Sequence, residues 1–96
     1  MYEKRVTLDN PTGFHVRPAT LFMETASRFQ SAIHVLKDTQ VADGKSAISL
    51  MLLEAQQGTQ LTIQALGDDE VAAVRALVDL VERQFGESTS GNEARR

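Results

Sequence analysis

The apolar residues of this 96-residue chain change their spacing several times, and these changes limit the folds that the chain can adopt. From Tyr2 to Leu8 the side chains alternate with a period of two, which is typical of an amphipathic strand. The turn-forming run at residues 9–13 ends that strand. From Val16 onward, apolar residues recur at helical spacing. The first third of the chain therefore predicts a strand followed by an amphipathic helix, with a buried stripe formed by Ala19, Phe22, Met23, Ala26 and Phe29.

The rest of the chain predicts three more strands and two more helices. Strands are expected at residues 31–37, 40–42 and 61–65. Helices are expected after Ser46 as far as residues 57–58, and over residues 71–85, where Gly86 ends the last helix. The order β-α-β-β-α-β-α with short connections predicts an α+β fold, in which one sheet carries the helices on one face. We expect one domain over residues 1–86 and a polar, disordered tail over residues 87–96.

Composition excludes several classes of function. The chain contains no cysteine, which rules out disulfides, thiolate nucleophiles and cysteine-ligated metal centres. A net charge of −3, with acids and bases mixed, argues against nucleic-acid binding. No apolar run reaches the roughly 18 residues that a membrane-spanning helix requires. No apolar stretch follows the first residues as it would in a signal peptide, so we expect a cytoplasmic protein.

His15 is the residue best placed for chemistry, because it stands between the turn and the first predicted helix. Free backbone N–H groups and the positive end of the helix dipole favour anions there and disfavour an imidazolium ion. A neutral imidazole is a nucleophile, and the guanidinium of Arg17 suits a phosphoryl group in shape and charge. Together these groups could accept a phosphoryl group covalently. The alternative is that His15 is an ordinary surface histidine beside a turn.

Ser46 has the side-chain chemistry of a helix N-cap. The dianion of a phosphoserine would be tolerated at a helix start, so capping and regulatory phosphorylation are compatible roles. After Ser46, the residues Ile48, Met51 and Leu52 make the helix more apolar than one core-facing stripe requires. This excess suits either a docking surface or additional core packing.

The other polar residues favour structural explanations. His34 lies in the middle of a predicted strand, on the side opposite Ile33 and Val35, as a solvent-facing residue would. His15 and His34 lack a third ligand at a suitable spacing, so we expect no metal site, and no residue pattern calls for a cofactor. The acids at residues 68–70 precede the last helix, where its dipole favours them.

Two motifs resemble one known family. The run Gly13-Phe14-His15-Val16-Arg17-Pro18-Ala19 closely matches the G-[LF]-H-x-R-P-A signature of HPr, the histidine phosphocarrier family of the bacterial phosphotransferase system. Gly44-Lys45-Ser46 resembles the serine-centred motif of that family. The resemblance covers residues 2–85, and the order of the predicted elements is the family's own. Residues 46–53 look closer to the nitrogen-related branch, NPr, than to the sugar-transport branch.

The resemblance implies an open-faced β-sandwich, with a four-stranded antiparallel sheet and three helices on one face. It implies that His15 takes a phosphoryl group on Nδ1 from Enzyme I, which draws it from phosphoenolpyruvate, and hands it to a IIA protein or domain. Arg17 would steady the group, and Ser46 would be the regulatory site of an HPr kinase/phosphorylase. The chain would be a monomeric relay protein and not a stand-alone enzyme. Its partners would dock around Thr20, Ala47, Ile48, Met51 and Leu52.

Three other functions fit the sequence less well. A regulatory adaptor controlled through Ser46 would bind partners without relaying phosphate, but the chain retains His15 with Arg17 and Pro18. A small ligand-binding regulatory domain would need a set of converging polar residues, which the sequence does not show. A metabolic enzyme would need a base beside the one candidate nucleophile. The relay function is therefore the expectation.

Overall fold

The computed structural model describes residues 1–87, and within them the predicted order β-α-β-β-α-β-α is confirmed. A short 3-10 turn follows the last helix. Of the predicted tail, only Glu87 is described, and residues 88–96 lie outside the described part of the chain. The elements are β1 (Tyr2–Leu8), α1 (Val16–Ala26), β2 (Ala32–Lys37), β3 (Gln40–Asp43), α2 (Ala47–Met51), β4 (Thr59–Leu66), α3 (Glu70–Glu82) and the 3-10 turn η1 (Gln84–Gly86).

The four strands form one antiparallel sheet in the order β1-β4-β2-β3. β4 lies between β1 and β2, so the last strand in sequence is central and β1 is an edge strand. Val6 pairs with Leu61, and Val35 pairs with Ile63. All four of these side chains are buried. The alternation read from the sequence therefore turns one face of the sheet toward the core.

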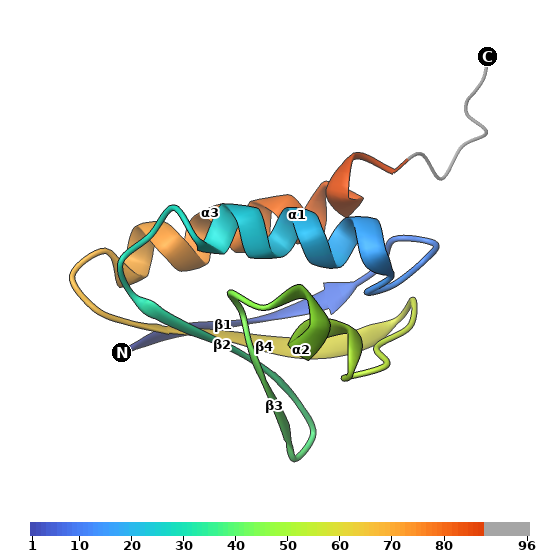
Figure 1. Cartoon of the computed structure of the whole chain (residues 1–96), viewed down its shortest axis with the longest axis horizontal. Helices are drawn as coiled ribbons and strands as arrows, with labels where there is room; N and C mark the ends of the chain where they lie inside the picture. The colour runs from blue at the N-terminus through green and yellow to red at the C-terminus, as the bar shows by residue number, and fades with distance from the viewer. Residues whose placement is uncertain (88–96) are drawn as a thin grey trace.

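The helices lie on that face of the sheet. α1 and α3 run side by side across it, and the shorter α2 contacts α1 and β3 (Figure 1). No helix in the described part of the chain covers the opposite face, which gives the sandwich its open side. No helix among residues 1–87 is long and apolar enough to cross a membrane.

The hydrophobic core fills the space between the helices and the sheet. Phe22 of α1, Leu50 of α2, Leu77 of α3 and Ile63 of β4 are fully buried. Burial of one such side chain contributes about 1.5–3 kcal/mol. The ring of Phe14, just before α1, packs edge-on against Phe22 with 5.6 Å between ring centroids. The segment that leads into α1 is therefore anchored in the core.

Helix α2 ends earlier than the sequence predicts. It stops at Met51, whereas the apolar pattern predicts a helix that reaches residues 57–58. Glu54 has a left-handed backbone with a φ of 53°, which breaks the helical path. Leu53 and Ala55 on either side of it are buried. The apolar pattern continues past the helix because a loop, and not another helical turn, delivers these two side chains to the core.

Helix α3 also ends early, at Glu82, where the sequence predicts helix as far as Phe85. The backbones of Gln84, Phe85 and Gly86 are all left-handed, with φ values of 57°, 55° and 78°. This turn places Phe85 in the core at 2% exposure. Gly86 therefore ends the 3-10 turn η1 and not α3 itself.

Candidate functional site

His15 occupies the N-cap position of α1, immediately before the first helical residue, as the sequence predicts. Its backbone is extended, with φ −75° and ψ −178°, and its side chain is exposed. Most N-cap residues use their side chain to accept a hydrogen bond from an early amide of the helix. The His15 side chain forms no such bond. The imidazole therefore faces solvent, and the early amides keep their donor capacity.

The first amides of α1 include donors without a helical partner, next to His15 in the chain. The early N–H groups of a helix have no partner within the helix. Pro18 has no N–H, and the amide of Ala19 donates to the carbonyl of His15 at 2.9 Å. The amides left without a helical partner are those of Val16 and Arg17. Because the helix dipole is positive at this end, the two donors point at a place that favours negative charge.

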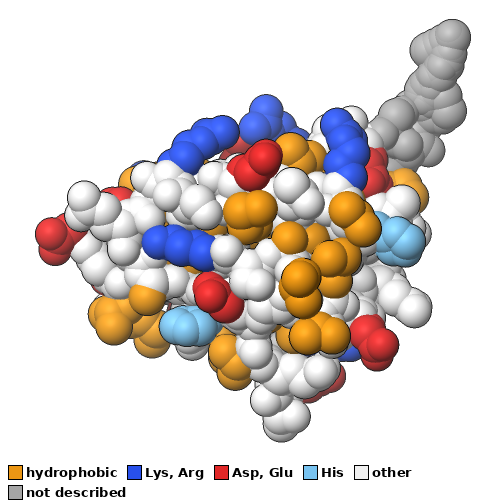
Figure 2. All heavy atoms as spheres, in the orientation of Figure 1, with side chains coloured by type: hydrophobic (Ala, Val, Ile, Leu, Met, Phe, Trp, Pro, Cys, Tyr) orange, Lys and Arg blue, Asp and Glu red, His pale blue; other side chains and the backbone are white. Residues whose placement is uncertain are grey.

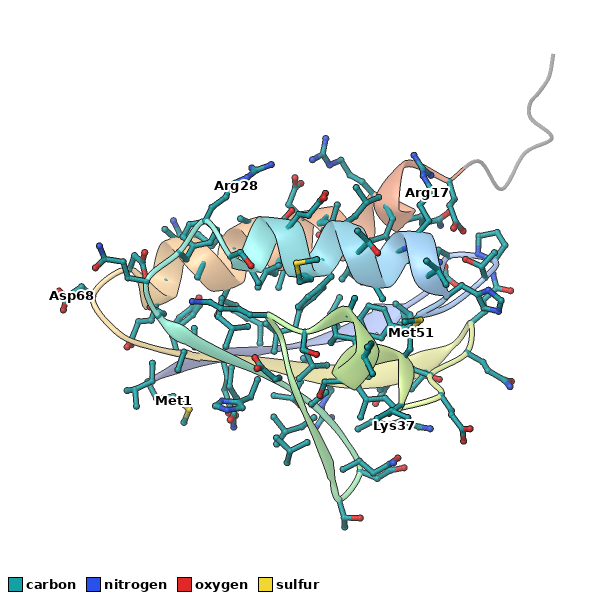
Figure 3. All side chains as sticks on the ribbon, viewed as in Figure 1. Met1, Arg17, Arg28, Lys37, Met51 and Asp68 are labelled. Atoms are coloured by element: carbon teal, nitrogen blue, oxygen red, sulfur yellow. The ribbon has the colours of Figure 1, made fainter. Side chains whose placement is uncertain are left out.

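Arg17 supplies the cationic side chain of the site. Its side chain is exposed, and neither of the two salt bridges found within residues 1–87 involves it. Figure 3 shows Arg17 at the start of α1. Residues two apart on a helix point to different sides, so only the length and flexibility of the Arg17 side chain would bring its guanidinium toward a group on His15. Its planar fork is then suited to bidentate binding of phosphoryl oxygens.

The loop before His15 packs against the loop that follows α2. The amide of Phe14 donates to the carbonyl of Ala55 at 3.0 Å. Gly13 is left-handed with a φ of 66°, and a Cβ atom there would clash with the Ala55 carbonyl oxygen and lie 2.9 Å from Cα of Gln56. Only glycine combines this backbone with so close an approach. Gly13 therefore fixes the path by which the chain enters α1.

An open groove lies where these two loops meet the start of α1. Lys37, at the end of β2, provides a cation in its wall, and Nζ of Lys37 donates to the carbonyl of Leu53 at 2.8 Å. Sequence spacing does not identify Lys37 as part of this region, because folding brings it there from a distant segment. The groove is lined by Pro11, Thr12, Phe14, His15, Val16, Lys37, Met51, Glu54, Ala55, Gln56 and Gln57.

Ser46 caps α2, as the sequence predicts. Its Oγ accepts from the amide of Ser49 at 3.2 Å. Ser49 in turn accepts from the amide of Asp43 through its own Oγ at 2.9 Å. Nζ of Lys45 donates to the carbonyl of Phe29 at 2.7 Å, which ties this turn to the connection between α1 and β2. The half-buried Ser46 side chain thus sits in a turn that is fixed to both β3 and the α1–β2 connection.

An exposed apolar patch lies on α1 and α2 and reaches the residue next to His15. We call Val16, Ile48, Met51 and Leu52 the α1–α2 patch. Val16, Ile48 and Leu52 are 64%, 68% and 70% exposed, and Met51 is half-buried. Figure 2 shows hydrophobic side chains gathered here, and Figure 3 shows Met51 between α2 and the start of α1. Ile48 and Leu52 are therefore surface residues and not additional core.

The two remaining residues of the predicted docking surface lie within the same pair of helices. Thr20 is on α1, one turn after Val16, and Ala47 is the first residue of α2. Both are half-buried. Because residues four apart on a helix lie on the same side, Thr20 continues the line that Val16 begins. Val16 also belongs to this exposed surface, although the sequence did not predict it there.

His34 lies away from this site. It is exposed in the middle of β2, and its register partners are Asp43 of β3 and Gln64 of β4. It therefore sits on the open face of the sheet, as the sequence predicts. Among residues 1–87, no three His, Asp or Glu side chains are grouped so that they could hold a metal ion.

The acidic residues at the start of α3 stabilise the opposite end of the molecule. The carboxylate of Asp69 accepts from the Ser31 hydroxyl and from the amides of Gln30 and Ser31, at 2.9 and 3.0 Å for the amides. These hydrogen bonds lower the pKa of Asp69, and the bond from the Ser31 hydroxyl has the largest effect. The amide of Gly67, and then the N-terminal ammonium, lower the pKa of Glu70. Asp69 therefore caps the connection between α1 and β2 and not its own helix, where it makes no side-chain bond.

The chain is similar to proteins of known family and structure. Residues 2–83 match the family model described as the PTS HPr component phosphorylation site. Phosphocarrier protein HPr of Neisseria meningitidis is 39% identical, over 91% of this chain and 98% of the relative. The HPr-like protein Crh of Halalkalibacterium halodurans is 38% identical, over 88% of this chain and 100% of the relative. The crystal structure of HPr from Thermoanaerobacter tengcongensis has a TM-score of 0.89 and 46% identity, and covers 92% of this chain and 99% of its own.

The fold and the matching family model define the class of protein, a carrier of phosphoryl groups. The chain belongs to the HPr family and is a phosphocarrier of the phosphotransferase system. The predicted open-faced sandwich, with its four-stranded antiparallel sheet and three helices, is confirmed by the similarity to solved HPr structures.

Proposed function

We propose that His15 receives a phosphoryl group from phosphorylated Enzyme I and passes it to a IIA protein or domain. The observation that carries this proposal is the exposed imidazole at the N-terminus of α1, with the amides of Val16 and Arg17 beside it. His34 is the only other histidine of the chain, and it lies in mid-strand with no helix start beside it. Of the two histidines, only His15 therefore has the free amides of a helix start beside it to bind a phosphoryl group.

The transfer needs a nucleophile and a place for negative charge. The lone pair of Nδ1 of His15 attacks phosphorus, the bond between phosphorus and the donor breaks, and the donor keeps that electron pair. Nε2 retains its proton throughout. The amides of Val16 and Arg17 and the Arg17 guanidinium donate to the phosphoryl oxygens, which stabilises charge in the transition state. Transfer to the IIA acceptor uses the same contacts in the opposite direction.

The α1–α2 patch, with Thr20 and Ala47 beside it, is the docking surface in this proposal. Exposed apolar side chains that can be desolvated by a partner mark protein interaction sites. The patch includes Val16, so a partner seated on it also covers the start of α1. This places the partner's reacting group next to His15.

Aspartate substitutions test the docking surface. Ile48→Asp and Leu52→Asp are expected to raise the concentration needed for half-maximal phosphorylation by Enzyme I by about tenfold, the loss that about 1.4 kcal/mol of docking energy produces. Val41→Asp and Leu66→Asp are matched controls, because these side chains are 62% and 61% exposed and lie on strands β3 and β4, outside the α1–α2 patch. Equal effects of the two pairs would remove the docking assignment.

A relay assay tests the function as a whole. The chain is mixed with phosphoenolpyruvate, Enzyme I and a IIA protein, and the phosphorylation of IIA is followed with time. We expect transfer with the wild-type chain and with His34→Ala, and none with His15→Ala. If IIA is phosphorylated at the wild-type rate through the His15→Ala chain, the proposed relay is wrong.

A regulatory role through Ser46 is the second candidate function. It is supported by the position of Ser46 at the start of α2, two residues before the exposed Ile48 of the α1–α2 patch. A phosphate added by an HPr kinase/phosphorylase would place about two negative charges beside a surface that must lose its water on docking. Ser46→Asp is therefore expected to slow phosphorylation of His15 while the melting temperature holds. A Ser46→Asp chain that is phosphorylated at the wild-type rate would leave Ser46 as a cap only.

We further propose that the chain works as a monomer, since one copy contains the whole of the site. One solved relative is described as an HPr dimer from Thermoanaerobacter tengcongensis. Light scattering at the concentrations of the relay assay decides between the two states: a monomer mass with full transfer is expected, and transfer found only in a dimer fraction contradicts the proposal.

A further inference from the structure

Glu87 places its carboxylate on the loop that leads to His15. Its Oε2 accepts from the hydroxyl of Thr12 at 2.7 Å, and its Oε1 accepts from Nδ2 of Asn10 at 3.2 Å and lies 3.5 Å from the amide of Thr12. A hydrogen bond to an ionised acceptor is stronger than one between neutral groups. The last described residue of the chain is thus joined to a loop 75 positions earlier.

The backbone before Glu87 directs it toward this loop. Gln84, Phe85 and Gly86 are consecutively left-handed, a conformation that is unfavourable for the two non-glycine residues. The ring of Phe85 is buried and packs against the ring of Phe14, with 6.0 Å between centroids. Such a backbone persists only where its surroundings hold it in place. Here the buried ring and the carboxylate of Glu87 both fix the turn against the residues that precede His15.

Asn10 connects the Glu87 carboxylate to the backbone of the loop before His15. Asn10 is completely buried, and its Nδ2 donates to the carbonyl of Gly13 at 2.9 Å as well as to Glu87. Its Oδ1 is buried without a hydrogen-bond partner among residues 1–87. A carboxylate only accepts, so Glu87 requires the nitrogen of Asn10, and not the oxygen, to face it. The same orientation keeps the Gly13 carbonyl bonded and the loop closed.

We propose that Glu87 is a positioning residue for phosphoryl transfer at His15. It acts through its hydrogen bonds to Asn10 and Thr12. The loop before His15 is thus held on one side by Glu87 and on the other by the loop after α2, through the bond from Phe14 to Ala55; we call this arrangement the clamp. The inference rests on the proposed function of His15 but concerns a different residue. With the carboxylate in place, the loop holds the imidazole in one direction relative to the first amides of α1. Without it, the loop samples other positions, and fewer encounters with a docked partner are productive.

The test separates positioning from docking and from folding. Glu87→Gln keeps the size of the side chain and removes its charge, and Thr12→Val removes the hydroxyl partner. Glu82→Gln, on the exposed side of α3, is the matched control. We expect Glu87→Gln to lower the maximal rate of transfer from phosphorylated Enzyme I by about tenfold, since a displacement of 1 Å can cost about 100-fold. The half-saturating concentration should not change, because the α1–α2 patch is untouched.

Amide hydrogen exchange supplies a readout that does not depend on transfer. The amide of Gly13 donates to the carbonyl of Asn10 at 3.2 Å and reports whether the loop is closed. We expect faster exchange of this amide in Glu87→Gln, and wild-type exchange in Glu82→Gln. Unchanged exchange overturns the clamp, even if the chain accepts no phosphoryl group at all. Faster exchange with a wild-type maximal rate overturns the positioning role and leaves Glu87 as a structural residue.

Discussion

Replacement of Gly13 by alanine is expected to be more damaging than its small size suggests. In the left-handed backbone of Gly13, a residue with a Cβ atom is less stable than glycine by about 1–2 kcal/mol. The new methyl group would also meet the Ala55 carbonyl and the Cα of Gln56, which are backbone atoms and cannot rotate away. Overpacking of this kind costs about 1–3 kcal/mol. We therefore expect Gly13→Ala to lower the free energy of unfolding by about 2–5 kcal/mol, the range that the two effects span together.

The chain provides a matched control for this substitution. Gly58 is also left-handed, with a φ of 93°, but a Cβ atom there would have no neighbour within 4 Å. Gly58→Ala should therefore show only the backbone effect, about 1–2 kcal/mol. Urea unfolding followed by circular dichroism gives both values. If the two alanine variants are equally stable, then Gly13 is required for its backbone alone, and the close approach of the two loops does not stabilise the site.

Three further predictions concern the site and its surroundings. Arg17→Ala should lower the maximal transfer rate by about 100-fold, as loss of one transition-state donor does, and leave the free energy of unfolding within about 0.5 kcal/mol of wild type; a wild-type rate would remove its role. Ser46→Ala should destabilise the chain by about 1 kcal/mol through loss of the α2 cap, measured by urea unfolding, and an unchanged midpoint would show that the cap contributes nothing. Because hydrogen bonds lower the pKa of Asp69 below 3.8, its stabilisation is complete above the pKa of the unfolded state and is lost as pH falls through the folded value. Asp69→Asn should therefore flatten the fall of melting temperature between about pH 5 and pH 2, and an unchanged acid profile would contradict the contact with Ser31.

The parts of the fold that the sequence predicts are those set by local pattern. Alternation over residues 2–8 predicts β1, because a strand buried on one face must alternate. The turn run followed by a helical stripe predicts that His15 stands at a helix start, and Ser46 is recognised as a cap because its side chain acts on residues close in sequence. Each of these features depends on a few neighbouring residues, so each can be predicted from the local sequence.

The parts that the sequence does not predict depend on contacts between distant segments. Lys37 and Gln56 join the groove with His15 through the packing of loops, and no periodic pattern connects them. The hydrogen bonds of Glu87 span 75–77 positions, and a polar residue after Gly86 is indistinguishable from a tail in the sequence. The early ends of α2 and α3 also depend on distant contacts. After each helix, burial of apolar side chains offsets the cost of a left-handed turn, which local propensity disfavours.

Site mapping of the phosphorylated chain tests whether His15 is the residue that carries the phosphoryl group. The chain is treated with phosphoenolpyruvate and Enzyme I, and the product is examined by intact mass, by ³¹P NMR and by peptide mapping under alkaline conditions, in which phosphohistidine survives. We expect one phosphoryl group, bound to Nδ1 of His15, labile in acid, present in His34→Ala and absent from His15→Ala. A phosphoryl group found on His34, or one retained by the His15→Ala chain, would contradict this assignment.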